Sequence, residues 1–161
     1  MKLTVQLKLQ PTPIQASSLK RTLETANAAC DYISQVAFST QTFRQFPIHR
    51  LTYQAARETF RLATQLTVRC IAKVADAYKL DRKVQRTFQP HGAIAYDERI
   101  LSFALPDSLV SIWTLDGRQA IPFVCGERGA NCSNTSAVKP IWYSLAEAGT
   151  CSRRAKSRRQ T

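Results

Sequence analysis

Alternation of apolar and polar residues at both ends of the segment 1–125 constrains the fold more than any other feature of this sequence. The segment 109–115 would place its residues on two strand faces: Leu109, Ser111, Trp113 and Leu115 on one, and Val110, Ile112 and Thr114 on the other. Asp116-Gly117 suits a two-residue hairpin turn, after which Gln119–Val124 would return. Met1–Gln10 alternates in the same way. Since an isolated hairpin is marginally stable, we predict that all these strands share one sheet.

The residues between the strands have the spacing of helices. A helix is predicted to begin at Pro13, because Thr12 can cap it and Gln15 completes a capping box. Steps of three and four give its expected buried stripe: Leu19, Leu23, Ala26, Cys30, Ile33 and Ala37. After a polar loop at 39–49, helices are predicted at about 50–63 and 64–80. Their expected inward residues are Leu51, Ala55 and Phe60 in the second helix, and Leu66, Cys70, Val74 and Tyr78 in the third.

These patterns predict an α+β protein. It would be a partial β-barrel, wedge-like and similar to oligonucleotide-binding barrels, with a helical insertion and a disordered basic tail. The first barrel strand would cover residues 1–11, the helical insertion 12–89, the remaining strands and hairpin 90–128, and the tail 129–161. In the tail the periodicity disappears, and Lys139, Arg153, Arg154, Lys156, Arg158 and Arg159 oppose the single acidic residue Glu147.

The overall charge favours an anionic partner. Lys and Arg number 23 against 11 Asp and Glu, which gives a net charge of +12 and an isoelectric point near 10.0. No apolar run approaches the ~18 residues of a membrane span, and no signal-peptide pattern follows Met1. We therefore expect a cytoplasmic protein without membrane contact, whose five cysteines are reduced thiols.

The residue types that usually carry catalysis or bind metals are not arranged for either task. The spacing between Cys125 and Cys132 is too wide for a zinc knuckle, and His91 is the only histidine near the strands. Asp97 and Glu98 are adjacent, which favours a turn over a pair of metal ligands. We predict no catalytic residues, no metal and no cofactor. The sequence therefore predicts a binding module and not an enzyme.

Two parts of the sequence resemble one known family. Gln10-Pro11-Thr12-Pro13-Ile14-Gln15-Ala16, together with Leu19–Leu23 and the opening strand, resembles the start of TnpB-type proteins, which are transposon-encoded, RNA-guided DNA nucleases. Ile94–Gly126 resembles the barrel segment that precedes the nuclease domain of that family. The resemblance implies that barrel and insertion hold guide RNA and DNA. Tyr32-Ile33-Ser34 stands where the family often has an aromatic-Asn pair, and the nuclease domain and its four-cysteine zinc element are missing.

The tail suggests a reason for the missing domain. If the frame from Gly129 onward is shifted back by one base, the codons from Glu147 onward can encode Gly-Ser-Trp-Tyr-Leu-Leu-Ala, which resembles the strand that TnpB-type chains carry next. We hypothesise that a frameshift near codon 129 truncated the product. A genuine basic tail is the alternative.

The resemblance implies that this is the nucleic-acid-binding N-terminal part of a TnpB-like protein, inactive as a nuclease on its own. The alternatives are a stand-alone RNA-binding regulator that uses the basic tail, and one half of a split nuclease. Expected contacts to duplex DNA come from the second helix: Tyr53, Gln54, Arg57 and Arg61. A basic ladder along and after the third helix would bind phosphates: Arg69, Lys73, Lys79, Arg82, Lys83 and Arg86.

Overall fold

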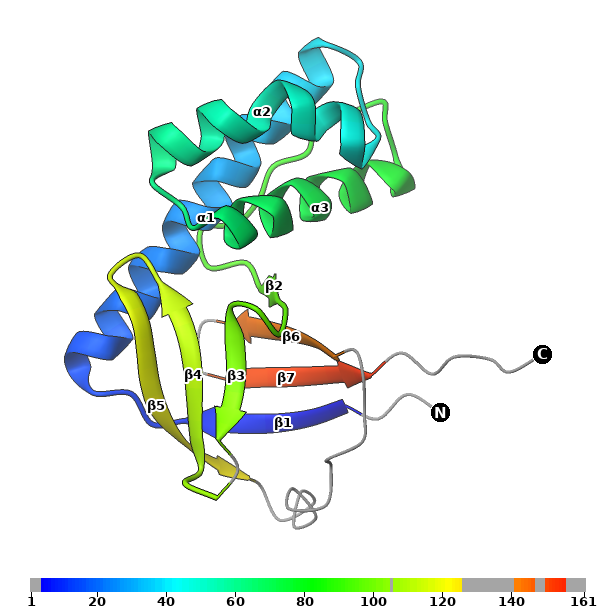
Figure 1. Cartoon of the computed structure of the whole chain (residues 1–161). Helices are drawn as coiled ribbons and strands as arrows, with labels where there is room; N and C mark the ends of the chain where they lie inside the picture. Colours follow the sequence, from blue (N-terminus) through cyan, green and yellow to red (C-terminus); the bar gives the residue numbers. More distant parts are fainter. Residues whose placement is uncertain (1–3, 105, 126–140, 147–149, 156–161) are drawn as a thin grey trace.

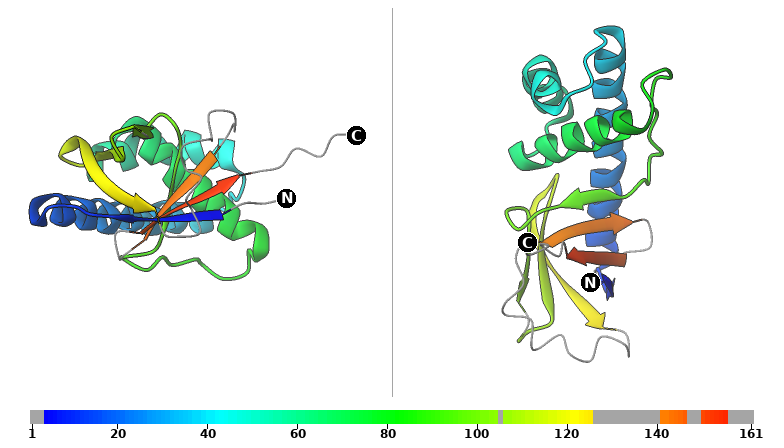
Figure 2. Two further views of the ribbon diagram at one scale, coloured as in Figure 1. Left: turned by 90° about the horizontal axis from the view of Figure 1, so that it is seen from below. Right: turned by 90° about the vertical axis from the view of Figure 1, so that its right-hand side faces the viewer.

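The computed structural model describes residues 4–104, 106–125, 141–146 and 150–155, and it is an α+β structure. Three helices, α1 (Pro13–Ser39), α2 (Gln45–Phe60) and α3 (Thr64–Leu80), follow the first strand. They gather at one end of a curled antiparallel sheet (Figure 1). The N-terminal part of α1 lies beside the sheet and its C-terminal part packs against α2 and α3 (Figure 2). α1 therefore connects the sheet to the other two helices.

The sheet has seven strands in the order β2-β6-β7-β1-β5-β4-β3. Their bounds are β1 (Thr4–Leu9), β2 (Ile94–Tyr96), β3 (Leu101–Ala104), β4 (Leu109–Thr114), β5 (Gly117–Cys125), β6 (Ile141–Ala146) and β7 (Thr150–Ala155). The sheet is open, because β2 and β3 stand at its two ends and no pairing joins them within the described residues. A turn at 97–100 links these end strands, with Ile100 N donating to Asp97 O at 3.1 Å.

The expectation of disorder throughout 129–161 is wrong for two segments of it. β6 pairs with β2 through Ile94↔Leu145, and β7 pairs with β1 through Thr4↔Arg154. Apolar and aromatic residues at 141–143 have the strand preference that the charged residues nearby obscured. The remaining tail residues lie outside the described part of the chain.

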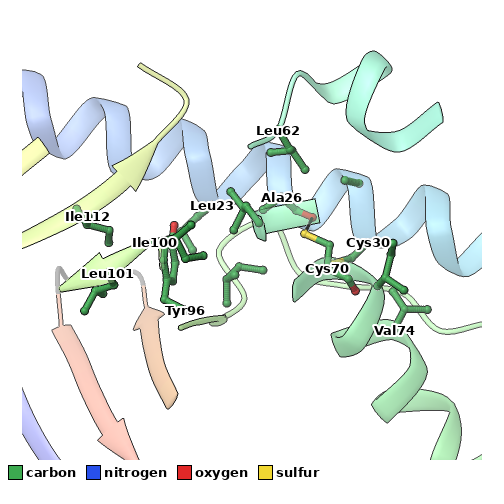
Figure 3. Close-up of a cluster of buried hydrophobic side chains, with 14 of the residues drawn as sticks. Leu23, Ala26, Cys30, Leu62, Cys70, Val74, Tyr96, Ile100, Leu101 and Ile112 are labelled. Atoms are coloured by element: carbon green, nitrogen blue, oxygen red, sulfur yellow. Dashed lines mark hydrogen bonds between the residues drawn. The ribbon is translucent and has the colours of Figure 1, made fainter. Parts of the chain in front are cut away.

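α1 follows its sequence prediction closely. The Thr12 side chain accepts a hydrogen bond from Gln15 N at 3.3 Å, and Gln15 Oε1 accepts one from Thr12 N at 3.0 Å, which confirms the capping box. Every residue of its expected apolar stripe is buried. In the core view, Leu23 and Ala26 lie between a sheet cluster and a helical cluster (Figure 3). The labelled members are Tyr96, Ile100, Leu101 and Ile112 on the sheet side, and Cys30, Cys70 and Val74 on the helical side.

The prediction for α2 was wrong in its start and its buried face. The helix begins at Gln45, five residues before the expected start, so the predicted loop at 39–49 contains its first turn. Ile48, Thr52 and Ala56 are buried, whereas Leu51 is 51% exposed. α3 has the predicted bounds and all four predicted buried residues.

The β4–β5 hairpin is confirmed with its turn one residue earlier than expected. Thr114 pairs with Gly117, so Leu115 and Asp116 form the loop, and Gly117 has the positive φ of +101°. Val110, Ile112 and Thr114 share one face, as the alternation predicted, and this face is the buried one. The opposite face of the hairpin is therefore turned outward.

Candidate nucleic-acid interface

A row of polar side chains on α1 holds the segment 81–92, which leads from α3 back to the sheet. The hydrogen bonds run from Asn27 Nδ2 to the carbonyl oxygens of Pro90 (3.0 Å) and Gly92 (2.8 Å), from Phe88 N to Asp31 Oδ1 (2.7 Å), and from Ser34 Oγ to Arg86 O (2.6 Å). Asn27, Asp31 and Ser34 are four and three residues apart, which places them on one helix face. The segment 81–92 therefore runs antiparallel to α1, and these bonds fix the position of α3 relative to it.

Lys73 is part of this arrangement. Its ammonium group donates to Asn27 Oδ1 at 2.6 Å and lies 5.0 Å from the centre of the Phe88 ring. Burial lowers the pKa of Lys73, and the neighbouring Cys30, Cys70 and Asp31 side chains oppose this effect. Lys73 was expected to bind phosphate, but its hydrogen bond joins α3 to α1.

Arg69 also faces the protein. Its Nε lies 3.4 Å from Asp97 Oδ2, and only 14% of its side chain is exposed. Gln65 donates a hydrogen bond to the same carboxylate. Arg69 therefore connects α3 to the turn between β2 and β3, and the first two members of the predicted basic ladder have structural contacts.

The exposed face of α2 carries a row of polar and basic residues. Arg50, Gln54, Arg57 and Arg61 are separated by four, three and four residues and are all exposed. At about 100° per residue, Arg50, Gln54 and Arg57 fall within an arc of about 60°, opposite the buried Ile48, and Arg61 follows directly after the helix as its left-handed C-cap. We call these four residues the α2 stripe. Gln54 donates a hydrogen bond to Glu58, the only acidic residue of the helix.

The arginines of the α2 stripe are available to an external anion. Within the described part of the chain, Arg50, Arg57 and Arg61 form no ion pair and no hydrogen bond through their side chains. Tyr53 lies beside the stripe, half-buried, and its ring stacks on that of His49 with centroids 4.6 Å apart and planes at 15°. This stacking holds an aromatic ring next to unpaired guanidinium groups.

The remaining predicted residues lie at the far end of α3. Lys79 pairs with Asp76, Arg86 lies 3.5 Å from Asp81, and the Arg82 guanidinium is 5.8 Å from the Phe43 ring. The side chains of Lys79, Arg82 and Lys83 are exposed. Two of these four cations, Lys79 and Arg86, are therefore already balanced by carboxylates.

Comparison with known proteins gives no family. No protein-family model matches the chain, and a search of curated proteins finds no match. Among the described residues, no helix has the length and apolar character needed to cross a lipid bilayer. The same residues hold no cluster of three or more His, Cys, Asp or Glu side chains that could bind a metal ion.

Sequence reasoning missed Arg50 and the polar row on α1. Arg50 lay within the predicted helix at about 50–63. Its spacing of four and seven residues from Gln54 and Arg57 is the signal that could have placed it on the stripe. Asn27, Asp31 and Ser34 do share one helix face, but their partner is an irregular segment that no periodicity reveals.

Proposed function

We propose that this chain binds nucleic acid through the α2 stripe, as the N-terminal binding part of a TnpB-like protein, and that it performs no nuclease chemistry by itself. The observation that carries the proposal is the group of exposed, unpaired arginines formed by Arg50 and Arg57 on one face of α2 and Arg61 directly after its end. Guanidinium groups form bidentate hydrogen bonds with phosphate oxygens. A straight helix face can follow one phosphate backbone or enter a duplex groove.

Gln54 in the α2 stripe and Tyr53 beside it offer uncharged hydrogen-bonding groups to a nucleic acid. An amide can pair with the edge of a base, and a phenol hydroxyl can bind a phosphate. Lys79, in the last turn of α3, and Arg82 and Lys83, just after it, are exposed and would add phosphate contacts. The curled sheet, whose end strands are linked by one short turn, supports the partial-barrel interpretation and hence the resemblance to oligonucleotide-binding barrels.

The test compares arginines that are free with one that is paired. Arg50→Gln and Arg57→Gln together should reduce the slope of log K against log salt by about 1.8, at about 0.9 per phosphate contact, for a labelled duplex DNA and for a structured RNA. Arg21→Gln is the matched control, because Arg21 pairs with Asp116 at 2.7 Å. Fluorescence anisotropy at several salt concentrations measures the slope. Equal slopes for the double variant and the control would refute the assignment.

The origin of the chain needs a separate test. The coding DNA beyond codon 120 should be read in all frames. A nuclease domain in a shifted frame would support the hypothesis of a frameshift near codon 129, and an original frame with nothing TnpB-like downstream would exclude it.

A further inference from the structure

The outward face of the β4–β5 hairpin is a second surface suited to nucleic acid. We propose that it binds single-stranded nucleic acid by stacking a base on Trp113. This inference rests on the proposed function and adds a second surface, which contacts bases. Trp113 is 38% exposed and is the last residue but one of β4, next to the hairpin turn. Its neighbours Ile112 and Thr114 are buried, so the alternation of the strand directs the indole outward.

An arginine is held over the indole ring. Arg118 is the cross-strand partner of Trp113, and its guanidinium carbon lies 5.9 Å from the ring centre. Its Nη2 also donates to Arg99 O at 2.9 Å, which restrains the side chain. Ring and guanidinium are thus positioned before any ligand arrives. An aromatic plane with a fixed cation beside it can accept a base and the phosphate attached to it.

The rest of this face carries small or apolar side chains on β4 and β5 and no acidic residue. The residues that share it on β4 and β5 are Leu109, Ser111, Ala120, Pro122 and Val124, and none is acidic. Ser111 and Ala120 pair across the strands, so small side chains adjoin the indole. Lys8, on β1, is exposed and pairs with Val124 at the other end. The exposed acids Glu98, Asp107 and Asp116 lie in the neighbouring turns and not on the strands, and Asp116 pairs with Arg21 at 2.7 Å.

Stacking on Trp113 requires an unpaired base. In a duplex both faces of every internal base are already stacked, so a duplex can contact this surface only through its phosphates. The face therefore favours single strands, whereas the α2 stripe offers charge to any phosphate backbone. This difference separates the two surfaces experimentally.

The experiment uses the full chain with a short oligothymidylate and an abasic strand of equal length, which has the same phosphates and no bases. The sequence has two tryptophans, so Trp142→Phe leaves Trp113 as the single fluorescent indole. Oligothymidylate should quench its fluorescence and the abasic strand should not. Trp113→Ala should weaken oligothymidylate binding about 5- to 150-fold, the range for loss of one stacked base, and leave abasic binding unchanged.

Each outcome decides between the two proposals. If both strands bind equally and neither quenches Trp113, stacking is excluded while the proposed function stands. If neither strand nor duplex binds at low salt, the proposed function itself fails. Because quenching is read without any change at Trp113, the proposal remains testable if Trp113→Ala does not fold. Trp113→Phe, which keeps a ring at this position, should retain a preference for oligothymidylate over the abasic strand, and loss of that preference would overturn the stacking role.

Discussion

Asn27 should be one of the most sensitive positions of the helical layer. It is fully buried; its amide nitrogen contacts the carbonyl oxygens of Leu23, Pro90 and Gly92, and its oxygen accepts from Lys73. The two amide hydrogens can form two good bonds at a time, each contributing about 0.5–1.5 kcal/mol, and the bond from the charged ammonium contributes about 1.5–3 kcal/mol. Asn27→Ala recovers less than about 0.7 kcal/mol of helix propensity. The expected net loss in the free energy of unfolding is therefore about 2–5 kcal/mol.

Urea denaturation measures this loss as a lower midpoint at an unchanged slope. Gln35→Ala is the matched control, because it removes an exposed amide from the same helix and should change stability by less than about 0.5 kcal/mol. Amide hydrogen exchange should also quicken at Phe88 and Gly92, which the polar row holds. Equal effects of the two substitutions, or unchanged exchange in the segment 81–92, would refute the role given to Asn27.

Two further predictions concern ionisable groups. The hydrogen bond from Ser18, with the nearby Arg21, lowers the pKa of Asp116, so its contribution to stability is present above pH 3.8, its ordinary pKa, and is lost as pH falls through the lowered folded pKa. Tm should therefore fall less steeply with decreasing pH in Asp116→Asn than in the unmodified protein. Equal slopes of Tm against pH for the two proteins would contradict this. The hydrogen bond with Cys30 and burial raise the pKa of Cys70. Both thiols should escape an iodoacetamide pulse until urea unfolds the chain, and alkylation of the native protein, read by mass spectrometry, would show that they are accessible.

The sequence predicted the elements whose signals are local. The start of α1 is determined by Thr12, Pro13 and Gln15, which are neighbours, and the capping bonds form as expected. The start of α2 has no such signal, because Arg44 forms no capping bond and Pro47 resembles a loop residue. A proline is tolerated there because first-turn N–H groups have no partner within the helix. The five-residue error in the start also misassigned the buried face.

The shared sheet of the first strand and the hairpin was predicted from their alternation, but the pairing of β6 and β7 could not be. β6 and β7 depend on β2 and β1 for their hydrogen bonds, and nothing in the local sequence 141–155 identifies those partners. Because β7 pairs directly with β1, deletion of 129–161 would remove two strands from between β1 and β2. A loss of binding after that deletion would therefore report on folding as well as on the basic tail.

Some residues of the basic ladder stabilise the fold instead of facing a ligand. At about 100° per residue, Arg69 and Lys73 are about 40° apart on α3, whereas Lys79 is turned about 120° away from Lys73, so the ladder never formed one face. Arg69 and Lys73 contact Asp97 and Asn27 instead of solvent. Substituting Lys73 would change stability together with binding. Arg50 and Arg57, which are exposed and unpaired, are the residues whose substitution changes the charge presented to a ligand while leaving the contacts among α1, α2 and α3 in place.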